Sequence, residues 1–166
     1  RRNLTEAQAS ELMIALADTA VAPAMGGALL AALRTKGVTA DELRGFAKSM
    51  RKLSRRPILS AGTPLVDMVG TGGDGSGSFN LSSGAALLVA SMGIRVAKHG
   101  TSSVSSRSGS ADVIKALGLP LPLDEVSAGE CLDATGFTFF FAPHYHPAMK
   151  ALMPIRIMPP WPAGMR

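Results

Sequence analysis

Residues 67–83 read Asp-Met-Val-Gly-Thr-Gly-Gly-Asp-Gly-Ser-Gly-Ser-Phe-Asn-Leu-Ser-Ser, and they are the most informative stretch of the chain. The apolar run at 65–69 predicts a short strand, a glycine-rich turn follows, and a helical pattern occupies 83–92. Glycine lets the backbone approach a ligand closely, and the start of a helix offers unpaired N–H groups to an anion. Because Asp74 would repel a bare phosphate, the turn predicts a site for a phosphorylated sugar or a metal-bound diphosphate. The alternative is a flexible surface turn.

A second loop of similar character strengthens the first interpretation. Residues 94–98 predict a strand, residues 99–110 are rich in serine and glycine, and a helix is expected at 110–117. Both loops leave the carboxyl end of a predicted parallel strand, which is where open α/β sheets bind ligands. The two loops therefore predict one converging anion pocket.

Charge and composition narrow the class of protein. The 166 residues carry 17 basic and 12 acidic side chains, a net charge of +5 that favours an anionic ligand. Basic residues cluster only at 48–56 and aromatic residues make up 5%, so nucleic acid is not expected as a partner. The single cysteine, Cys131, excludes an internal disulfide and predicts a cytoplasmic location. No apolar run approaches the roughly 20 residues that span a membrane, so no membrane association is expected.

The order of patterns along the chain predicts an α/β fold, with a small N-terminal helical lobe plus a partial parallel β-sheet with flanking helices. The capping-box spacings Thr5 to Gln8 and Thr39 to Glu42 mark two helix starts in the lobe. Three short helices cannot enclose a core, so the lobe is expected to pack on the next domain or to form a dimer face.

The predicted organisation is a helical lobe at 1–54, a linker at 55–64, an α/β domain at 65–156 and an irregular terminal peptide at 157–166. Within the α/β domain the third strand is expected at 137–141, and further helices at 124–135 and 146–155.

Four ordered motifs resemble one enzyme family. They are Gly-Thr-Gly-Gly-Asp at 70–74, Asn-Leu-Ser-Ser at 80–83, Lys-His-Gly at 98–100 and Val-Ser-Ser-Arg-Ser-Gly-Ser-Ala-Asp at 104–112. Together they resemble the anthranilate phosphoribosyltransferases, which join anthranilate to phosphoribosyl pyrophosphate in tryptophan biosynthesis. The resemblance covers residues 4 to about 156. It implies an incomplete phosphoribosyl-binding domain and a homodimer formed through the helical lobe.

The resemblance also implies roles for individual residues. Residues 70–74 would wrap the pyrophosphate and the anomeric carbon, while Ser82 would contact Mg²⁺ on the diphosphate. The donor-binding set is Gly70, Thr71, Gly72, Gly73, Asp74, Asn80, Ser82, Ser83, Lys98, Ser106 and Ser110, and the acceptor-binding set is Gly70, His99, Thr101 and Arg156. No residue is assigned as catalytic, because the amine of anthranilate is already a nucleophile. Positioning and leaving-group stabilisation would carry most of the rate.

Two departures from the family pattern leave alternatives open. Thr101-Ser102 stands where the family usually has Asn-Arg, a pair that includes an acceptor contact. The family also continues beyond Arg156 with an Asp-Glu pair that binds Mg²⁺. A second hypothesis is therefore a truncated or diverged non-catalytic paralogue that binds a phosphoribosyl ligand or a partner. A third is a phosphorylase-like enzyme that acts on another aromatic compound or base.

Overall fold

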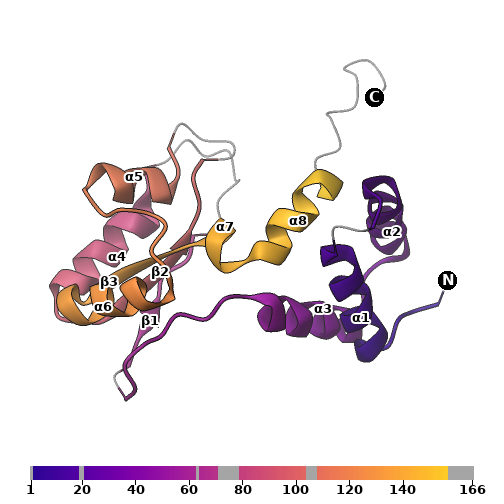
Figure 1. Cartoon of the computed structure of the whole chain (residues 1–166), viewed down its shortest axis with the longest axis horizontal. Helices are drawn as coiled ribbons and strands as arrows, with labels where there is room; N and C mark the ends of the chain where they lie inside the picture. Colours follow the sequence, from indigo (N-terminus) through magenta and orange to yellow (C-terminus); the bar gives the residue numbers. More distant parts are fainter. Residues whose placement is uncertain (1, 19–20, 63, 71–78, 104–107, 157–166) are drawn as a thin grey trace. The chain divides into compact units, whose positions relative to one another are not determined.

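Figure 1 shows the computed structural model of the chain, which describes residues 2–18, 21–62, 64–70, 79–103 and 108–156. The chain divides into two compact units. One unit combines the residues up to Ser54 with the segment that starts at His146, and the other is Arg55–Tyr145. The first and last described segments therefore belong to the same unit, and the sheet belongs to the other.

The described residues of the first unit, which we call the helical unit, form four helices: α1 (Glu6–Ala17), α2 (Pro23–Lys36), α3 (Ala40–Leu53) and α8 (Pro147–Arg156). Both predicted capping boxes are present, at the starts of α1 and α3. Helix α2 begins at Pro23 and stops at Gly37, whose φ of 87° is accessible to glycine at little cost.

Helix α8 supplies the apolar partner that the first three helices need. Leu152 and Ile155 pack with Leu16 of α1 in one buried cluster. A Cβ on Gly26 would lie 2.6 Å from the Ile155 side chain, so α2 and α8 approach closely only because residue 26 is glycine. From the sequence, this helix was expected in the α/β domain. In the structure it belongs to the helical unit, because its buried face is needed to close that core.

A buried carboxylate also holds the helical unit together. Glu42 accepts hydrogen bonds from the backbone N–H of Leu4 at 2.8 Å, the backbone N–H of Thr39 at 2.9 Å and Lys36 Nζ at 2.8 Å. These bonds, led by that from Leu4, lower the pKa of Glu42 to about 2. The side chain is fully buried, and its negative charge is paired with the Lys36 ammonium.

The second unit, which we call the α/β unit, contains a parallel sheet in the order β1-β2-β3. Its elements are β1 (Val66–Asp67), α4 (Leu81–Ser91), β2 (Val96–Gly100), α5 (Ser110–Ala116), α6 (Glu125–Thr135), β3 (Phe137–Phe141) and α7 (Ala142–Tyr145). The predicted fold class, a helical lobe with a partial parallel sheet and flanking helices, is confirmed. Strand β2 runs two residues further than predicted, because it stays paired with β3 as far as Gly100 and Phe141.

The two faces of the sheet have separate cores. Val96 and Phe139 lie in the cluster with Ala86 of α4 and Ile114 of α5. Ala97, Phe140 and Tyr145 lie in the other cluster, together with Ala128 of α6. Because successive strand residues point to opposite faces, Lys98 follows Val96 to the α4 and α5 face and His99 follows Ala97 to the α6 face.

The segment predicted as a linker, 55–64, is attached to the α/β unit. The backbone N–H of Arg55 donates to Tyr145 O and that of Ile58 donates to Glu125 O, both at 2.8 Å. The backbone at Ile58 also fits against Gly129 of α6, where a Cβ would lie 2.0 Å from Ile58 O. Proline and glycine in this segment thus accompany an ordered connection.

Among the described residues, no helix has the length and apolar character that crossing a membrane requires.

Candidate functional site

Lys98 is a buried cation near the carboxyl end of β2. Its side chain is 1% exposed, and Nζ donates to Met68 O at 2.9 Å and to Ser82 Oγ at 3.1 Å. Burial lowers the pKa of the Lys98 ammonium, and nearby Asp67 opposes that shift. Both acceptors are neutral, so within the described residues the charge has no anionic hydrogen-bond partner. A buried charge of this kind is stabilised by an arriving anion.

The start of α4 brings hydroxyl groups to the same place. Ser82 lies in the first turn, and a Cβ on Gly70 would come within 2.8 Å of Ser82 Oγ. Glycine at position 70 therefore lets the end of the β1 segment approach the helix start. Asn80 is the N-cap residue, but its side chain makes no capping hydrogen bond and is left available for other contacts.

Ser83 is the second unusual polar group at this helix start. Its side chain is 1% exposed, and its Oγ has no hydrogen-bond partner among the described residues. A buried hydroxyl without a partner is costly, and such groups in folded proteins call for an explanation. Lys98 and Ser83 are thus two buried polar side chains of this region whose hydrogen-bonding capacity is not filled among the described residues.

The second loop is closed by a carboxylate, Asp112, that lies in a family motif but had no predicted role. Asp112 accepts from the backbone N–H of Gly109 at 2.8 Å and of Ser103 at 3.0 Å, which lowers its pKa. Ser110 Oγ donates to Thr101 O at 3.4 Å. A Cβ at Gly100 would lie 2.1 Å from Ser110 Oγ, so the strand end and the start of α5 are in close contact.

His99 lies on the other face of the sheet and is oriented by two neighbours. Its Nδ1 is 3.0 Å from Asp67 Oδ2, and its ring centroid is 4.9 Å from that of Phe140. Asp67 ends β1, so the pair spans two neighbouring strands. Asp67 was not among the site residues predicted from the sequence. The available signal was a carboxylate at the end of the strand that precedes the glycine-rich turn.

The structure thus brings together part of the predicted site. Gly70, Asn80, Ser82, Ser83 and Lys98 gather at the carboxyl ends of β1 and β2, and Ser110 and Thr101 meet beside the end of β2. His99 lies on the opposite face, and Arg156 is the last residue of α8 in the helical unit. The predicted residues Thr71, Gly72, Gly73, Asp74 and Ser106 lie outside the described residues.

A magnesium ion at the start of α4 would be coordinated mainly by oxygens of a bound diphosphate, with few ligands from the protein. The described residues contain no group of three or more His, Cys, Asp or Glu side chains that could hold a metal. Ser82 Oγ accepts from Lys98 and keeps a second lone pair, so it fits as one neutral ligand. Mg²⁺ in proteins commonly keeps phosphate oxygens and waters as its other ligands.

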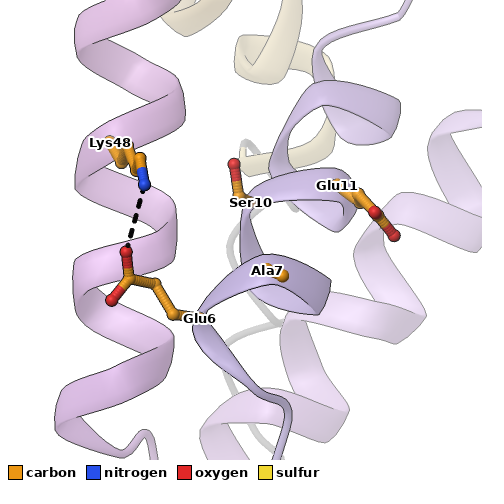
Figure 2. A pocket seen from close by; sticks show the side chains of 5 residues that line it. All are labelled: Glu6, Ala7, Ser10, Glu11 and Lys48. Carbon is orange, nitrogen blue, oxygen red and sulfur yellow. Dashed lines mark hydrogen bonds and ion pairs between the residues drawn. The ribbon is translucent and has the colours of Figure 1, made fainter.

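Figure 2 shows a separate hollow of about 410 Å³ in the helical unit, lined by Glu6, Ala7, Ser10, Glu11 and Lys48. Lys48 Nζ lies 3.4 Å from Glu6 Oε1, so the positive charge there already has an anionic partner. The Glu11 carboxylate points away from the other lining side chains. This hollow lacks the uncompensated polar groups found at the start of α4.

Both parts of the chain match one family. Residues 1–54 match the helical bundle domain of the glycosyl transferase family, and residues 62–158 match its α/β domain. The chain therefore belongs to the glycosyl transferase family.

Several of its relatives within that family are anthranilate phosphoribosyltransferases. The chain is 46% identical over 160 residues to the Synechocystis sp. protein of that name, covering 94% of this chain and 45% of the relative. It is 50% identical over 150 residues to the one from Brevibacillus brevis, covering 90% and 43%. The chain thus spans less than half the length of these curated relatives.

Solved structures give the same result. The anthranilate phosphoribosyltransferase of Thermus thermophilus superposes with a TM-score of 0.83 at 44% identity, covering 93% of this chain and 47% of that one. The Saccharomyces cerevisiae enzyme in complex with PRPP and Mg superposes with a TM-score of 0.74 at 27% identity, covering 90% and 46%.

Proposed function

We propose that this chain provides the phosphoribosyl-donor site of an anthranilate phosphoribosyltransferase. The reaction would transfer the phosphoribosyl group from phosphoribosyl pyrophosphate to anthranilate, giving phosphoribosylanthranilate and pyrophosphate. The observation that carries the proposal is the buried Lys98, whose hydrogen-bond partners among the described residues are two neutral oxygens, one of them Ser82 Oγ. The next residue along α4, Ser83, has a buried hydroxyl with no partner among the described residues. The names of the relatives and the yeast complex with PRPP and Mg support the proposal.

In this proposal the residues at the start of α4 hold the donor. Lys98, Asn80 and Ser83 contact the 5′-phosphate, because the buried ammonium and the unpartnered hydroxyl gain most from an anionic acceptor. Gly70, Thr71, Gly72, Gly73 and Asp74 would surround the pyrophosphate, with Ser106 and Ser110 beside the donor. Ser82 would contact Mg²⁺, which when bound neutralises charge on the diphosphate.

The chemistry then follows from charge and position. The bond from the anomeric carbon to pyrophosphate breaks, the bond to the amine nitrogen forms, and negative charge grows on the departing pyrophosphate. The substituted nitrogen then releases one proton to solvent. Fixed donors and cations stabilise that charge more strongly in the transition state than in the ground state. His99 and Thr101 would contact the acceptor. Asp67 would fix the orientation of the His99 ring through its bond to Nδ1.

We also propose that the chain forms a homodimer through the helical lobe at 1–54. We propose further that the protein is cytoplasmic. Large apolar side chains of this lobe are exposed, including Met25 at 63% and Leu43 at 58%.

A second candidate function is donor binding without turnover. The lack of a cluster of acidic side chains among the described residues favours that alternative.

Two measurements test the proposal. Titration calorimetry with phosphoribosyl pyrophosphate and Mg²⁺ should give binding to the wild-type chain, and Lys98→Met should weaken it about 10- to 100-fold, as expected for losing a charge-assisted bond. The exposed Lys52, changed to Met, is the matched control and should bind normally. No heat with the wild-type chain contradicts the donor site. Loss of anthranilate fluorescence on incubation with the donor separates the enzyme from the silent binder.

A further inference from the structure

Asp112 of α5 binds two backbone N–H groups, one at the start of its own helix and one outside it. Its Oδ2 accepts from the N–H of Gly109 at 2.8 Å and from the N–H of Ser103 at 3.0 Å. The bond from Gly109 is ordinary helix capping, because Gly109 is the N-cap residue and Asp112 is at N3. The bond from Ser103 is different, since Ser103 lies beyond the end of β2 and before the helix. Asp112 therefore joins the end of one element to the start of the next.

Two glycines show how closely these segments fit. A Cβ on Gly109 would lie 2.3 Å from Ser103 N and 2.7 Å from Thr101 O. A Cβ on Gly100, the last residue of β2, would lie 2.1 Å from Ser110 Oγ. Neither glycine has a positive φ, so these positions require space and not an unusual backbone conformation. The end of β2 and the start of α5 are thus in direct contact.

The charge of Asp112 is already bound within the chain. The bonds from Gly109 and Ser103 hold the pKa of the Asp112 carboxyl below its usual value, so the group is ionised at neutral pH. A carboxylate in direct contact with an anionic ligand would repel it. Asp112 is therefore suited to holding other groups in place, and not to touching such a ligand itself.

We propose that Asp112 is a positioning residue for the phosphoribosyl donor. By binding Ser103 and Gly109 with one oxygen, it fixes the spacing between the end of β2 and the start of α5. That spacing sets the place of Ser110, whose Oγ donates to Thr101 O at 3.4 Å and would contact the donor. The inference rests on the proposed function, because it needs the donor to bind beside Ser110.

The chain offers a matched control in a carboxylate that makes similar bonds without joining two elements. Asp124 is the N-cap residue of α6, and its Oδ1 accepts from the N–H of Val126 at 3.0 Å and of Ser127 at 2.7 Å. Both donors lie in the first turn of α6 itself. Helix α6 packs on the face of the sheet opposite to α5, through Ala128. Loss of Asp124 should therefore weaken a helix start and leave the end of β2 in place.

Titration calorimetry with phosphoribosyl pyrophosphate and Mg²⁺ tests the inference on the whole chain. Asp112→Ala should weaken donor binding about tenfold, because binding groups that are displaced lose much of their effect. Asp112→Asn keeps an oxygen that can accept both N–H groups, and should bind within about threefold of the wild type. Asp124→Ala should bind as the wild type does, although both alanine variants should lower the Tm to a similar extent.

Hydrogen exchange of the unliganded chain gives a readout that does not depend on the donor. The amides of Ser103 and Gly109 should exchange faster in Asp112→Ala than in the wild type, and Asp112→Asn should restore their protection. Circular dichroism verifies that each variant folds. If Asp112→Ala does not fold, Asp112→Leu takes its place, since leucine keeps a branched side chain without an oxygen.

Several results would overturn the inference and leave the proposed function standing. They are unchanged donor affinity in Asp112→Ala, an equal loss of affinity in Asp124→Ala, failure of Asp112→Asn to restore affinity, and unchanged exchange of the two amides in Asp112→Ala. No heat with the wild-type chain is a different result, because it overturns the proposed function and the inference together.

Discussion

The helical unit and the α/β unit each bury a charged side chain, but only the charge in the helical unit has an oppositely charged hydrogen-bond partner among the described residues. In the helical unit, Glu42 is buried with three donors around it, one of them the Lys36 ammonium. In the α/β unit, Lys98 is buried against two neutral oxygens, Met68 O and Ser82 Oγ, and the residue after Ser82 has a buried hydroxyl with no partner among the described residues. A charge whose partners are complete stabilises a fold, whereas an incompletely matched charge is suited to a ligand. Substitutions at the two sites should therefore affect different properties.

The largest effect is expected from Glu42→Ala. The change leaves the Lys36 ammonium and the N–H groups of Leu4 and Thr39 without their acceptor in the interior of the helical unit. Thermal unfolding followed by circular dichroism should show a larger fall in Tm than any of the substitutions in the α/β unit produces. Asp41→Ala, one residue away and exposed, should change Tm far less. Equal effects of the two changes would contradict a structural role for Glu42.

The same carboxylate predicts an acid limit for stability. Its pKa is about 2 in the folded chain and near 4.5 when unfolded, so its contribution is complete above the unfolded value. The contribution is lost as the pH falls from about 4.5 through 2. Urea unfolding at a series of pH values should show this loss in the wild-type chain and a weaker one in Glu42→Ala.

Lys98→Met should affect ligand affinity and not stability, the opposite of Glu42→Ala. Methionine keeps most of the side-chain volume and removes a buried charge, so the Tm should be unchanged or higher. Affinity for phosphoribosyl pyrophosphate should nevertheless fall about 10- to 100-fold. A lower Tm with unchanged affinity would place Lys98 with Glu42 as a structural charge.

A smaller effect is expected at Asp67. Removing its carboxylate in Asp67→Ala should shift His99 away from the tautomer that is protonated at Nδ1, because the acceptor 3.0 Å away is lost. Long-range nitrogen NMR can follow this, since the chain has three histidines. Asp67→Asn retains one oxygen acceptor and should restore part of the signal. Unchanged nitrogen shifts in Asp67→Ala would exclude the orienting role.

Ser83→Ala should have the smallest effect of these substitutions. Removing a buried hydroxyl that has no partner among the described residues should raise the free energy of unfolding by about 1 kcal/mol. Donor affinity should fall about threefold to tenfold, the range of one neutral hydrogen bond. Urea unfolding and calorimetry measure the two changes. A loss of stability would show that the hydroxyl already has a structural partner.

Local patterns in the sequence were sufficient to predict some features of the fold and of the candidate site. The capping box of Thr5 with Gln8, the parallel strands and the two glycine- and serine-rich segments at strand ends all follow from neighbouring residues. Lys98 could be placed near the loops because it comes at the end of an apolar run. Its acceptors could not be predicted, since Met68 O lies 30 positions away and is brought near only by strand pairing.

Other features depend on packing between distant segments. Leu152 and Ile155 give α8 an apolar face, but that face fits a sheet or a helix pair equally well from sequence alone. The choice depends on the small residue at Gly26, which lets Ile155 approach α2. Similarly, the proline- and glycine-containing segment at 55–64 has the composition of a linker. Its attachment depends on the space left at Gly129, which is distant in the sequence.

The position of α8 also constrains the order in which the protein can form during synthesis. The sheet and its helices are encoded between the two parts of the helical unit, so the ribosome completes Arg55–Tyr145 before it adds α8. The first three helices must wait for Leu152 and Ile155 to emerge before their shared core can close. The cluster of Leu16, Leu152 and Ile155 is therefore expected to close only after the segment that forms the sheet has been synthesised.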